Sequence, residues 1–321
     1  MDLNEANPLG TGCVLTMVFA ALLHELFGLR SSSAGSSTGD KAIVHGMGMA
    51  RSPGGTVPWA GAPGEAQFTA AFPPFDFLMS VARFNPFLAT GEMHDAQELL
   101  GWLLDSLHED LNRVRSRSIV GDAGCRFVVG TQRLDSHAEE RFAAEAWRAH
   151  LRRNRSVIVD LFQGQLRSQL RCPECGARSL TFDPFLHLSL PLPGTSGPSQ
   201  VRLEDAVALF CREEAMDGDN LWECPTCGKH VLAQKKLDLW KLPPLLMVHL
   251  KRFEWVQVVG SRPAAFHVRK LTCCVDLPQE RLNLRPLTPS PQKEPLLYDL
   301  VAVVDHLGAN VGDGHYTATC R

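Results

Sequence analysis

Two short cysteine pairs carry most of the chemical information in this sequence. Cys172 and Cys175 form one Cys-Pro-x-Cys turn, and Cys224 and Cys227 form a second, each followed directly by glycine. Zinc takes four thiolate ligands in a tetrahedron, and a Cys-x-x-Cys turn can supply two of them along one edge. The two turns together predict one structural Zn²⁺ site. Two reduced turns without a metal are the alternative that the residues leave open.

A histidine near the carboxyl end is the second candidate for chemistry. His315 stands between Gly314 and Tyr316, and a preceding glycine lets the backbone or a substrate approach closely. Imidazole is the usual general base for a thiol nucleophile. By itself, however, the tripeptide is more typical of a hydrogen-bonded structural histidine.

The composition limits where these residues act. The chain has 321 residues, 45% of them hydrophobic, which is enough for one large domain or two small ones. Its 32 basic and 35 acidic residues nearly balance, so we expect neither a nucleic-acid partner nor a membrane partner. The longest apolar run, 13–23, is too short to span a bilayer, and it follows acidic residues where a signal peptide would be basic. The ten cysteines show no secretory framework, so we expect an intracellular, reduced protein.

Helical patterns dominate the first half of the chain. Apolar residues recur at three-and-four spacing most clearly in the second of the three expected helices, 14–27, 95–113 and 138–153. The first of them reads as mostly buried. Asp95 and Glu98 have the spacing of a capping box. The stretch 31–64 is rich in Gly, Ser, Ala and Pro and predicts a disordered insert.

Strand patterns dominate after Asn154. Short β-branched or alternating segments predict strands at 157–159, 165–170, 186–190, 245–253, 298–305 and 315–320. One short helix, 203–211, is expected among them. Helices followed by a strand-rich half indicate an α+β fold and not a chain of βαβ units.

Taken together, ordered blocks of sequence resemble the ubiquitin-specific proteases, which are papain-like cysteine peptidases. Besides the two cysteine turns, the matching blocks are 94–100 (HDAQELL), 107–112 (LHEDLN), 156–160 (SVIVD), 162–165 (FQGQ), 181–185 (TFDPF), 236–240 (KLDLW), 242–244 (LPP), 249–253 (HLKRF) and 314–316 (GHY). The resemblance is strongest to the paralogue group with a ubiquitin-like insert in the catalytic domain. That insert would begin after Pro193 and is absent here.

The resemblance implies a hand-shaped α+β fold with thumb, palm and zinc-ribbon fingers, here incomplete. Residues 1–155 would form a helical, thumb-like part. Residues 156–255 would form the fingers and palm strands with the zinc ribbon. Residues 256–321 would supply the palm strands that carry the histidine block.

The resemblance also implies a function. Enzymes of the family hydrolyse the isopeptide bond after the terminal Gly-Gly of ubiquitin through a thioester, so ubiquitin and ubiquitinated proteins are the implied partners. His315 then matches the general base, and Asp95 and Glu98 match the block that holds the ubiquitin tail. Gly314 and Tyr316 would bind substrate beside the histidine. A capping box explains Asp95 and Glu98 equally well, and both roles are compatible.

The nucleophile has no clear match. The family's cysteine opens a helix in a Gly-Asn-Thr-Cys block, whereas Thr11 replaces the asparagine before Cys13. A better register matches 3–10 and 20–27 to the segment downstream of that block, which makes Cys13 an ordinary, partly buried thiol. The family's orienting Asp or Asn would lie beyond Arg321. We therefore expect a chain that is truncated at both ends and inactive as given.

Three hypotheses remain from the sequence. The chain is part of a cysteine deubiquitinase, or it is a non-catalytic pseudo-protease that binds ubiquitin. A zinc-stabilised interaction domain without a role in ubiquitin chemistry is the third. A Gly-Asn-Thr-Cys block in the coding sequence upstream of Met1 would distinguish the first hypothesis from the second.

Overall fold

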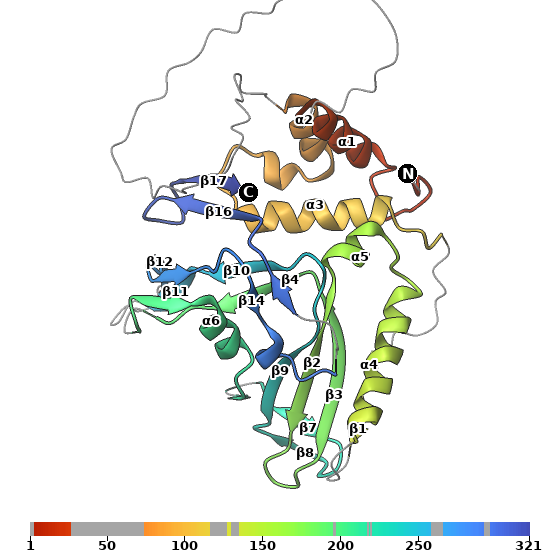
Figure 1. Ribbon diagram of the computed structural model, residues 1–321, viewed down its shortest axis with the longest axis vertical. Helices are drawn as coiled ribbons and strands as arrows, with labels where there is room; N and C mark the ends of the chain where they lie inside the picture. Colours follow the sequence, from red (N-terminus) through yellow and green to blue (C-terminus); the bar gives the residue numbers. More distant parts are fainter. Residues whose placement is uncertain are drawn as a thin grey trace, which may run out of the picture.

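The computed structural model describes residues 3–26, 74–115, 127–129, 135–194, 197–216, 218, 220–257, 266–291 and 296–321. Helices gather in the first half of the chain and strands in the second, which confirms the expected α+β class (Figure 1). The expected insert at 31–64 lies outside the described residues.

The helices confirm the three long segments expected from the sequence. They are α1 (Val14–Leu26), α2 (Phe75–Phe84), α3 (Ala96–Asp110), α4 (Ser136–Leu151), α5 (Val157–Phe162) and α6 (Leu203–Phe210), with short 3-10 helices η1 (Pro86–Ala89) and η2 (Arg285–Leu287). Helix α1 buries only one face, because Leu15 is enclosed while Met17 is 56% exposed. The expectation that this helix is mostly buried was therefore wrong.

The segment 157–159 is helical, and its prediction as a strand was wrong. The hydroxyl of Ser156 accepts a hydrogen bond from the backbone N–H of Val159 at 3.3 Å and thereby caps α5. Ile158 packs into the same apolar core as α3, and this contact stabilises the helical conformation. This tertiary packing and the cap outweigh the β preference of three consecutive branched side chains.

The largest sheet of the strand-rich half is antiparallel and has five strands. Its strand order is β1-β3-β2-β9-β6, and its longest pairings join β2 to β3 and β2 to β9. Helix α4 packs against β3 (Figure 1). The strands are β1 (Phe127–Val129), β2 (Gly164–Arg171), β3 (Arg178–Phe185), β6 (Glu214–Ala215) and β9 (Gln234–Lys241).

The remaining strands form two-stranded sheets. The parallel pairs are β4 (His187–Pro191) with β10 (Met247–Lys251) and β5 (Gln200–Arg202) with β13 (Cys274–Asp276). The antiparallel pairs are β7 (Trp222–Cys224) with β8 (Lys229–Val231), β11 (Phe253–Gln257) with β12 (Phe266–Lys270), β14 (Leu282–Asn283) with β15 (Leu297–Tyr298), and β16 (Ala302–Leu307) with β17 (His315–Cys320). Two expected strands, 245–253 and 298–305, are each divided into two.

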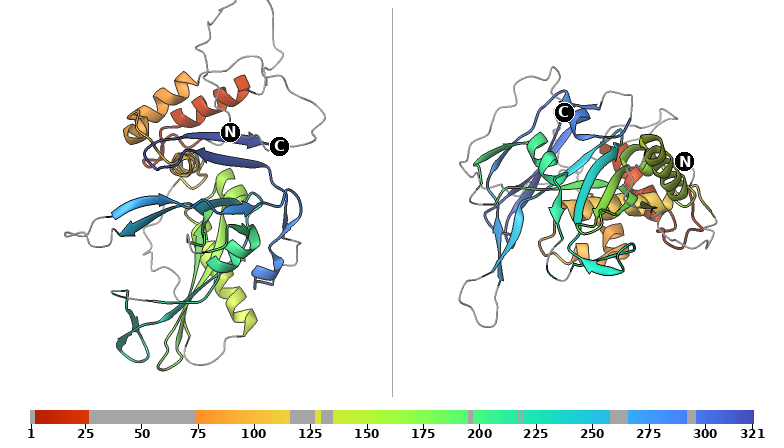
Figure 2. Two further views of the ribbon diagram at one scale, coloured as in Figure 1. Left: turned by 90° about the vertical axis from the view of Figure 1, so that its left-hand side faces the viewer. Right: turned by 90° about the horizontal axis from the view of Figure 1, so that it is seen from below.

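The apolar core is divided into separate clusters. The largest surrounds Leu188, Leu239 and Leu284 between α6 and the strands β4, β9 and β14. A second lies between α1, α3 and α5, and a third, around Trp222, encloses the cysteine turns. Figure 2 shows the β16–β17 hairpin between the α1–α2 pair and the β11–β12 ribbon, beside α3. This placement sets the carboxyl-terminal histidine block next to the helical half.

Candidate functional site

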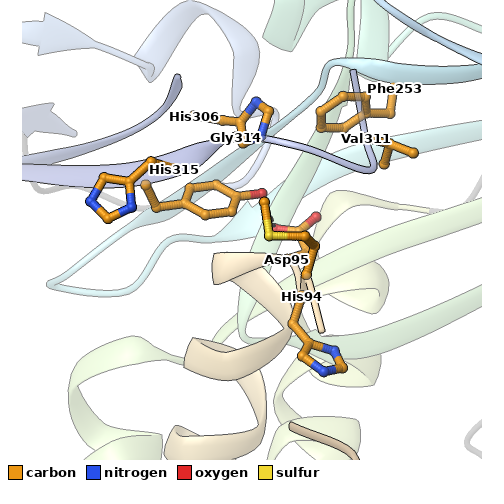
Figure 3. A pocket seen from close by; sticks show the side chains of 9 residues that line it. His94, Asp95, Phe253, His306, Val311, Gly314 and His315 are labelled. Carbon is orange, nitrogen blue, oxygen red and sulfur yellow. Dashed lines mark hydrogen bonds between the residues drawn. The ribbon is translucent and has the colours of Figure 1, made fainter. Parts of the chain in front are cut away.

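A pocket of about 210 Å³ lies between the β16–β17 hairpin and the amino end of α3 (Figure 3). It is lined by Met93, His94, Asp95, Phe253, His306, Val311, Gly314, His315 and Tyr316. Four residues expected at the site, Asp95, Gly314, His315 and Tyr316, therefore meet here. Asp95 and Tyr316 do so although they are 221 residues apart in the chain.

Asp95 connects the two halves of the pocket. As the N-cap of α3, its Oδ1 accepts a hydrogen bond from the backbone N–H of Gln97 at 2.9 Å. The hydroxyl of Tyr316 donates to the same oxygen at 3.4 Å, and burial together with this carboxylate raises the pKa of Tyr316. The helix N-terminus favours a carboxylate at this position. Asp95 is thus an anionic acceptor with a defined orientation at the pocket wall.

Glu98, the other residue expected to hold the ubiquitin tail, lies elsewhere. Its side chain is exposed, and it is not among the residues that line the pocket. Asp95 caps the helix through the N–H of Gln97, and within the described ranges Glu98 makes no hydrogen bond back to Asp95, so the expected capping box does not form. Asp95 therefore lines the pocket and Glu98 does not, although the sequence predicted the same role for both.

His249 is a neighbour of Asp95 that the sequence did not reveal. The block 249–253 was expected to be a buried strand, and its first three residues do lie in β10, but His249 is only half-buried. Its Nε2 lies 4.0 Å from Asp95 Oδ2, and its Nδ1 lies 3.2 Å from Ser189 Oγ. Burial lowers the pKa of His249, while Asp95 opposes that shift. Strand alternation shows which residues share a face with His249, but only the pairing of β10 with β4 shows what that face meets.

His306 is a second pocket histidine that the sequence left unassigned. It is the cross-strand partner of Tyr316, and their ring centroids are 4.9 Å apart. The ring of Phe253 approaches it edge-on, with centroids 5.4 Å apart. His306 therefore lies inside the pocket wall between two aromatic rings.

His315, the expected general base, occupies the rim. Its side chain is exposed and points away from Asp95 (Figure 3). Along β17 it alternates with Tyr316, and its cross-strand partner is Leu307. The thiol of Cys320 lies five residues further on the same strand, which is about 17 Å at the rise of an extended chain. Across the described part of the chain, His315 makes no hydrogen bond to a thiol.

Cys13 lies at the opposite end of α3. It is 1% exposed, its backbone N–H donates to Asp110 Oδ1 at 3.3 Å, and its thiol donates to the Asp110 carbonyl at 3.6 Å. Burial, and then the nearby Asp110 carboxylate, raise the pKa of this thiol. Asp110 closes α3, whereas Asp95 opens it, and the 15 residues of α3 span about 22 Å. These facts favour the interpretation of Cys13 as an ordinary buried thiol.

The four cysteines of the two turns form one cluster. Their sulfur atoms all lie within 4.8 Å of one another, and the cross-turn pairs Cys172–Cys227 and Cys175–Cys224 are 3.9 and 3.7 Å apart. A tetrahedron with Zn–S bonds of about 2.3 Å has edges of about 3.8 Å, so the donor set fits zinc. Backbone N–H groups of Cys175 and Glu174 lower the pKa of Cys172 to about 7, whereas the thiol of Cys175, with burial, raises the pKa of Cys227 to about 12.

The sequence pattern that defines the ubiquitin carboxyl-terminal hydrolase family matches residues 41–321. The chain belongs to this family. Ubiquitin carboxyl-terminal hydrolase 2 from Gallus gallus is 37% identical over 248 residues, which cover 77% of this chain and 64% of that protein. The Homo sapiens ubiquitin carboxyl-terminal hydrolase 21 is 35% identical over 256 residues, or 77% of this chain and 43% of its own length.

Solved structures of a member of the family share its fold. The SAGA Ubp8/Sgf11/Sus1/Sgf73 DUB module bound to ubiquitin aldehyde matches with a TM-score of 0.54 and 25% identity, covering 77% of this chain and 46% of the other. The predicted family and its α+β fold are therefore confirmed. This chain spans less than two thirds of the length of these relatives. None of the helices in the described ranges is long and apolar enough to cross a membrane.

Proposed function

We propose that this chain forms the ubiquitin-binding part of a deubiquitinase, a cysteine-type enzyme that hydrolyses the isopeptide bond after the carboxyl-terminal glycine of ubiquitin. The observation that carries the proposal is the pocket that Asp95 and Tyr316 line together, with His315 at its rim. Relatives named ubiquitin carboxyl-terminal hydrolase, and a structural neighbour bound to ubiquitin aldehyde, support ubiquitin as the ligand.

The roles follow from the chemistry of each group. The Asp95 carboxylate accepts hydrogen bonds, so it suits backbone N–H groups or a cationic side chain in an extended tail. Gly314 has a φ of 146°, and a Cβ there would meet the Leu307 carbonyl at 2.5 Å. A glycine is therefore required where the hairpin borders the pocket. The exposed imidazole of His315 is free to take a proton from a thiol that reaches the rim.

The four cysteines hold a Zn²⁺ ion with a structural role in this proposal. When bound, the ion supplies four metal–sulfur bonds that join the turn after β2 to the turn after β7. The surrounding apolar cluster is small, so the metal would contribute much of its stability. The cluster consists mainly of Trp222, Val231, Ala177 and Ala233. The ion takes no part in the hydrolysis.

We further propose that the chain as given binds ubiquitin without cleaving it. The support is that, in the described residues, His315 has no thiol beside it and Cys13 lies beyond the far end of α3. An enzyme would need its nucleophile from outside these residues, whereas a pseudo-protease would not need one. The nine cysteines among the described residues are free thiols, which supports an intracellular, reducing location for either form.

Calorimetric titration of the full chain with ubiquitin tests the binding proposal. We expect saturable binding that Asp95→Asn weakens about tenfold, because a neutral amide replaces the anionic acceptor. His315→Ala should leave the affinity within about twofold, since a general base contributes to turnover and not to binding. Absence of binding by the unsubstituted chain would contradict the proposal. Release of fluorophore from a ubiquitin–fluorophore conjugate would contradict the proposed inactivity.

A further inference from the structure

Lys270 makes three hydrogen bonds to the β16–β17 hairpin. Its ammonium Nζ lies 2.9 Å from His306 Nδ1, 2.9 Å from the His306 carbonyl and 2.7 Å from the Gly308 carbonyl. An ammonium carries three donors, so all three are used. Lys270 ends β12, and the sheet of β11 and β12 shares no strand with the hairpin in the described topology. Lys270 thus ties together two sheets that the backbone ladders leave separate.

The bond to His306 also assigns the protons of the imidazole. A lysine ammonium cannot accept a hydrogen bond, so Nδ1 must be the acceptor and the ring proton lies on Nε2. That edge of the ring faces Gly314, where an added Cβ would collide with Nε2. Phe253 and Tyr316 pack against the same ring. Among the described residues, the Nε2 proton has no hydrogen-bond acceptor.

The second and third bonds hold the turn that leads to His315. A Cβ on Gly308 would lie 2.8 Å from the Gly314 Cα. The two ends of the turn 308–314 therefore approach each other so closely that only glycine fits there. Lys270 holds the carbonyl of the first of these glycines. The residue that follows the second glycine is His315. The position of the pocket rim therefore depends on a side chain from another sheet.

We propose that Lys270 is a positioning residue for the tail pocket. It fixes His306 as the tautomer protonated on Nε2 and holds the turn 308–314 against β12. The pocket is then preformed before the ubiquitin tail arrives, which lowers the entropy cost of binding. Lys270 does not line the pocket, so it acts through His306 and Gly308. The part of this inference that concerns the tail rests on the proposed function.

The ring nitrogens of His306 give the first test, which needs no ligand. We expect ¹⁵N NMR of the full chain to show His306 protonated on Nε2, with the signals assigned by their loss in His306→Gln. In Lys270→Met the shifts of both nitrogens should move toward those of a tautomer mixture. Unchanged shifts in Lys270→Met would overturn the inference.

Binding of two forms of ubiquitin gives the second test. Lys270→Met should weaken binding of intact ubiquitin about tenfold, or about 1.4 kcal/mol, and leave binding of ubiquitin without its carboxyl-terminal tail unchanged. Lys235→Met is the matched control. Lys235 lies on β9 and forms a solvent-accessible salt bridge of 3.7 Å with Glu214 on β6. An equal loss for both ligands, or no loss, would overturn the inference. If the unsubstituted chain binds neither form, the proposed function fails, while the ring nitrogens still decide the Lys270–His306 link.

Discussion

Asp95 and Asp110 stand at the two ends of α3, and each holds a different end of the chain. Asp95 accepts a hydrogen bond from the hydroxyl of Tyr316, five residues before Arg321. Asp110 is fully buried and accepts the backbone N–H and the hydroxyl of Thr11, both at 2.6 Å. One helix therefore supports the pocket at its amino end and the amino-terminal segment at its carboxyl end.

Asp110→Asn should destabilise the chain strongly. The carboxylate also accepts the hydroxyl of Thr16 at 2.9 Å, and an amide would turn donor groups toward these donors. We expect the free energy of unfolding to fall by about 3 kcal/mol, the upper part of the range for an unsatisfied buried group. Urea unfolding measures it. Asp105→Asn, an exposed change on the same helix, should alter stability by less than about 0.5 kcal/mol. Similar losses in both variants would contradict the buried acceptor role.

Cys13 should react slowly with thiol reagents. Its burial and the Asp110 carboxylate raise its pKa, so little thiolate forms near neutral pH. In the folded chain, Cys13→Ala should not reduce the number of thiols that react quickly with Ellman's reagent. The control Cys320→Ala should remove one fast thiol, because Cys320 is exposed. Labelling by an electrophilic ubiquitin probe that disappears in Cys13→Ala would instead make Cys13 a nucleophile.

The cysteine cluster should hold one zinc ion per chain. We expect elemental analysis of the purified protein to find it and Cys175→Ser to lose it, while Cys211→Ser, outside the cluster, keeps it. Structural zinc can contribute roughly 10 kcal/mol or more of apparent binding energy. Removal should therefore speed amide exchange in β7 and β8 and leave α3 protected. Folded protein without zinc would contradict the assignment.

Stability should fall as the pH falls through about 6.5. Burial is the main cause that lowers the pKa of His150, His187 and His249. Below the unfolded pKa of about 6.5, the unfolded chain binds protons that these partly buried imidazoles do not bind in the folded chain, so acid favours unfolding. His150→Gln should flatten part of this dependence in urea unfolding between about pH 5 and 7. His137→Gln, at an exposed position, should leave the slope unchanged.

The sequence predicted features that depend on local spacing. The cysteine turns, the capping residue Asp95 and the strands at 165–170 and 315–320 each depend on residues close in the chain, and each forms as expected. The roles of His249, His306 and Lys270 depend on which strands pair and on which side chains then cross between sheets. Spacing along one strand carries no information about such contacts. The strand predicted at 157–159 failed for the same reason, because α5 is stabilised by packing on α3.

The sequence separation of 221 residues from Asp95 to Tyr316 also has a consequence during synthesis. At about 5–20 residues per second, some 10–40 s separate the emergence of these two residues from the ribosome. Helix α3 can form early, because its backbone hydrogen bonds are local, but the pocket can close only when β17 is complete. Until then the amino end of α3, with the exposed Leu99 and Leu100 beside it, remains open to chaperones. A nascent chain stopped before β17 would therefore carry a folded helical half and no pocket.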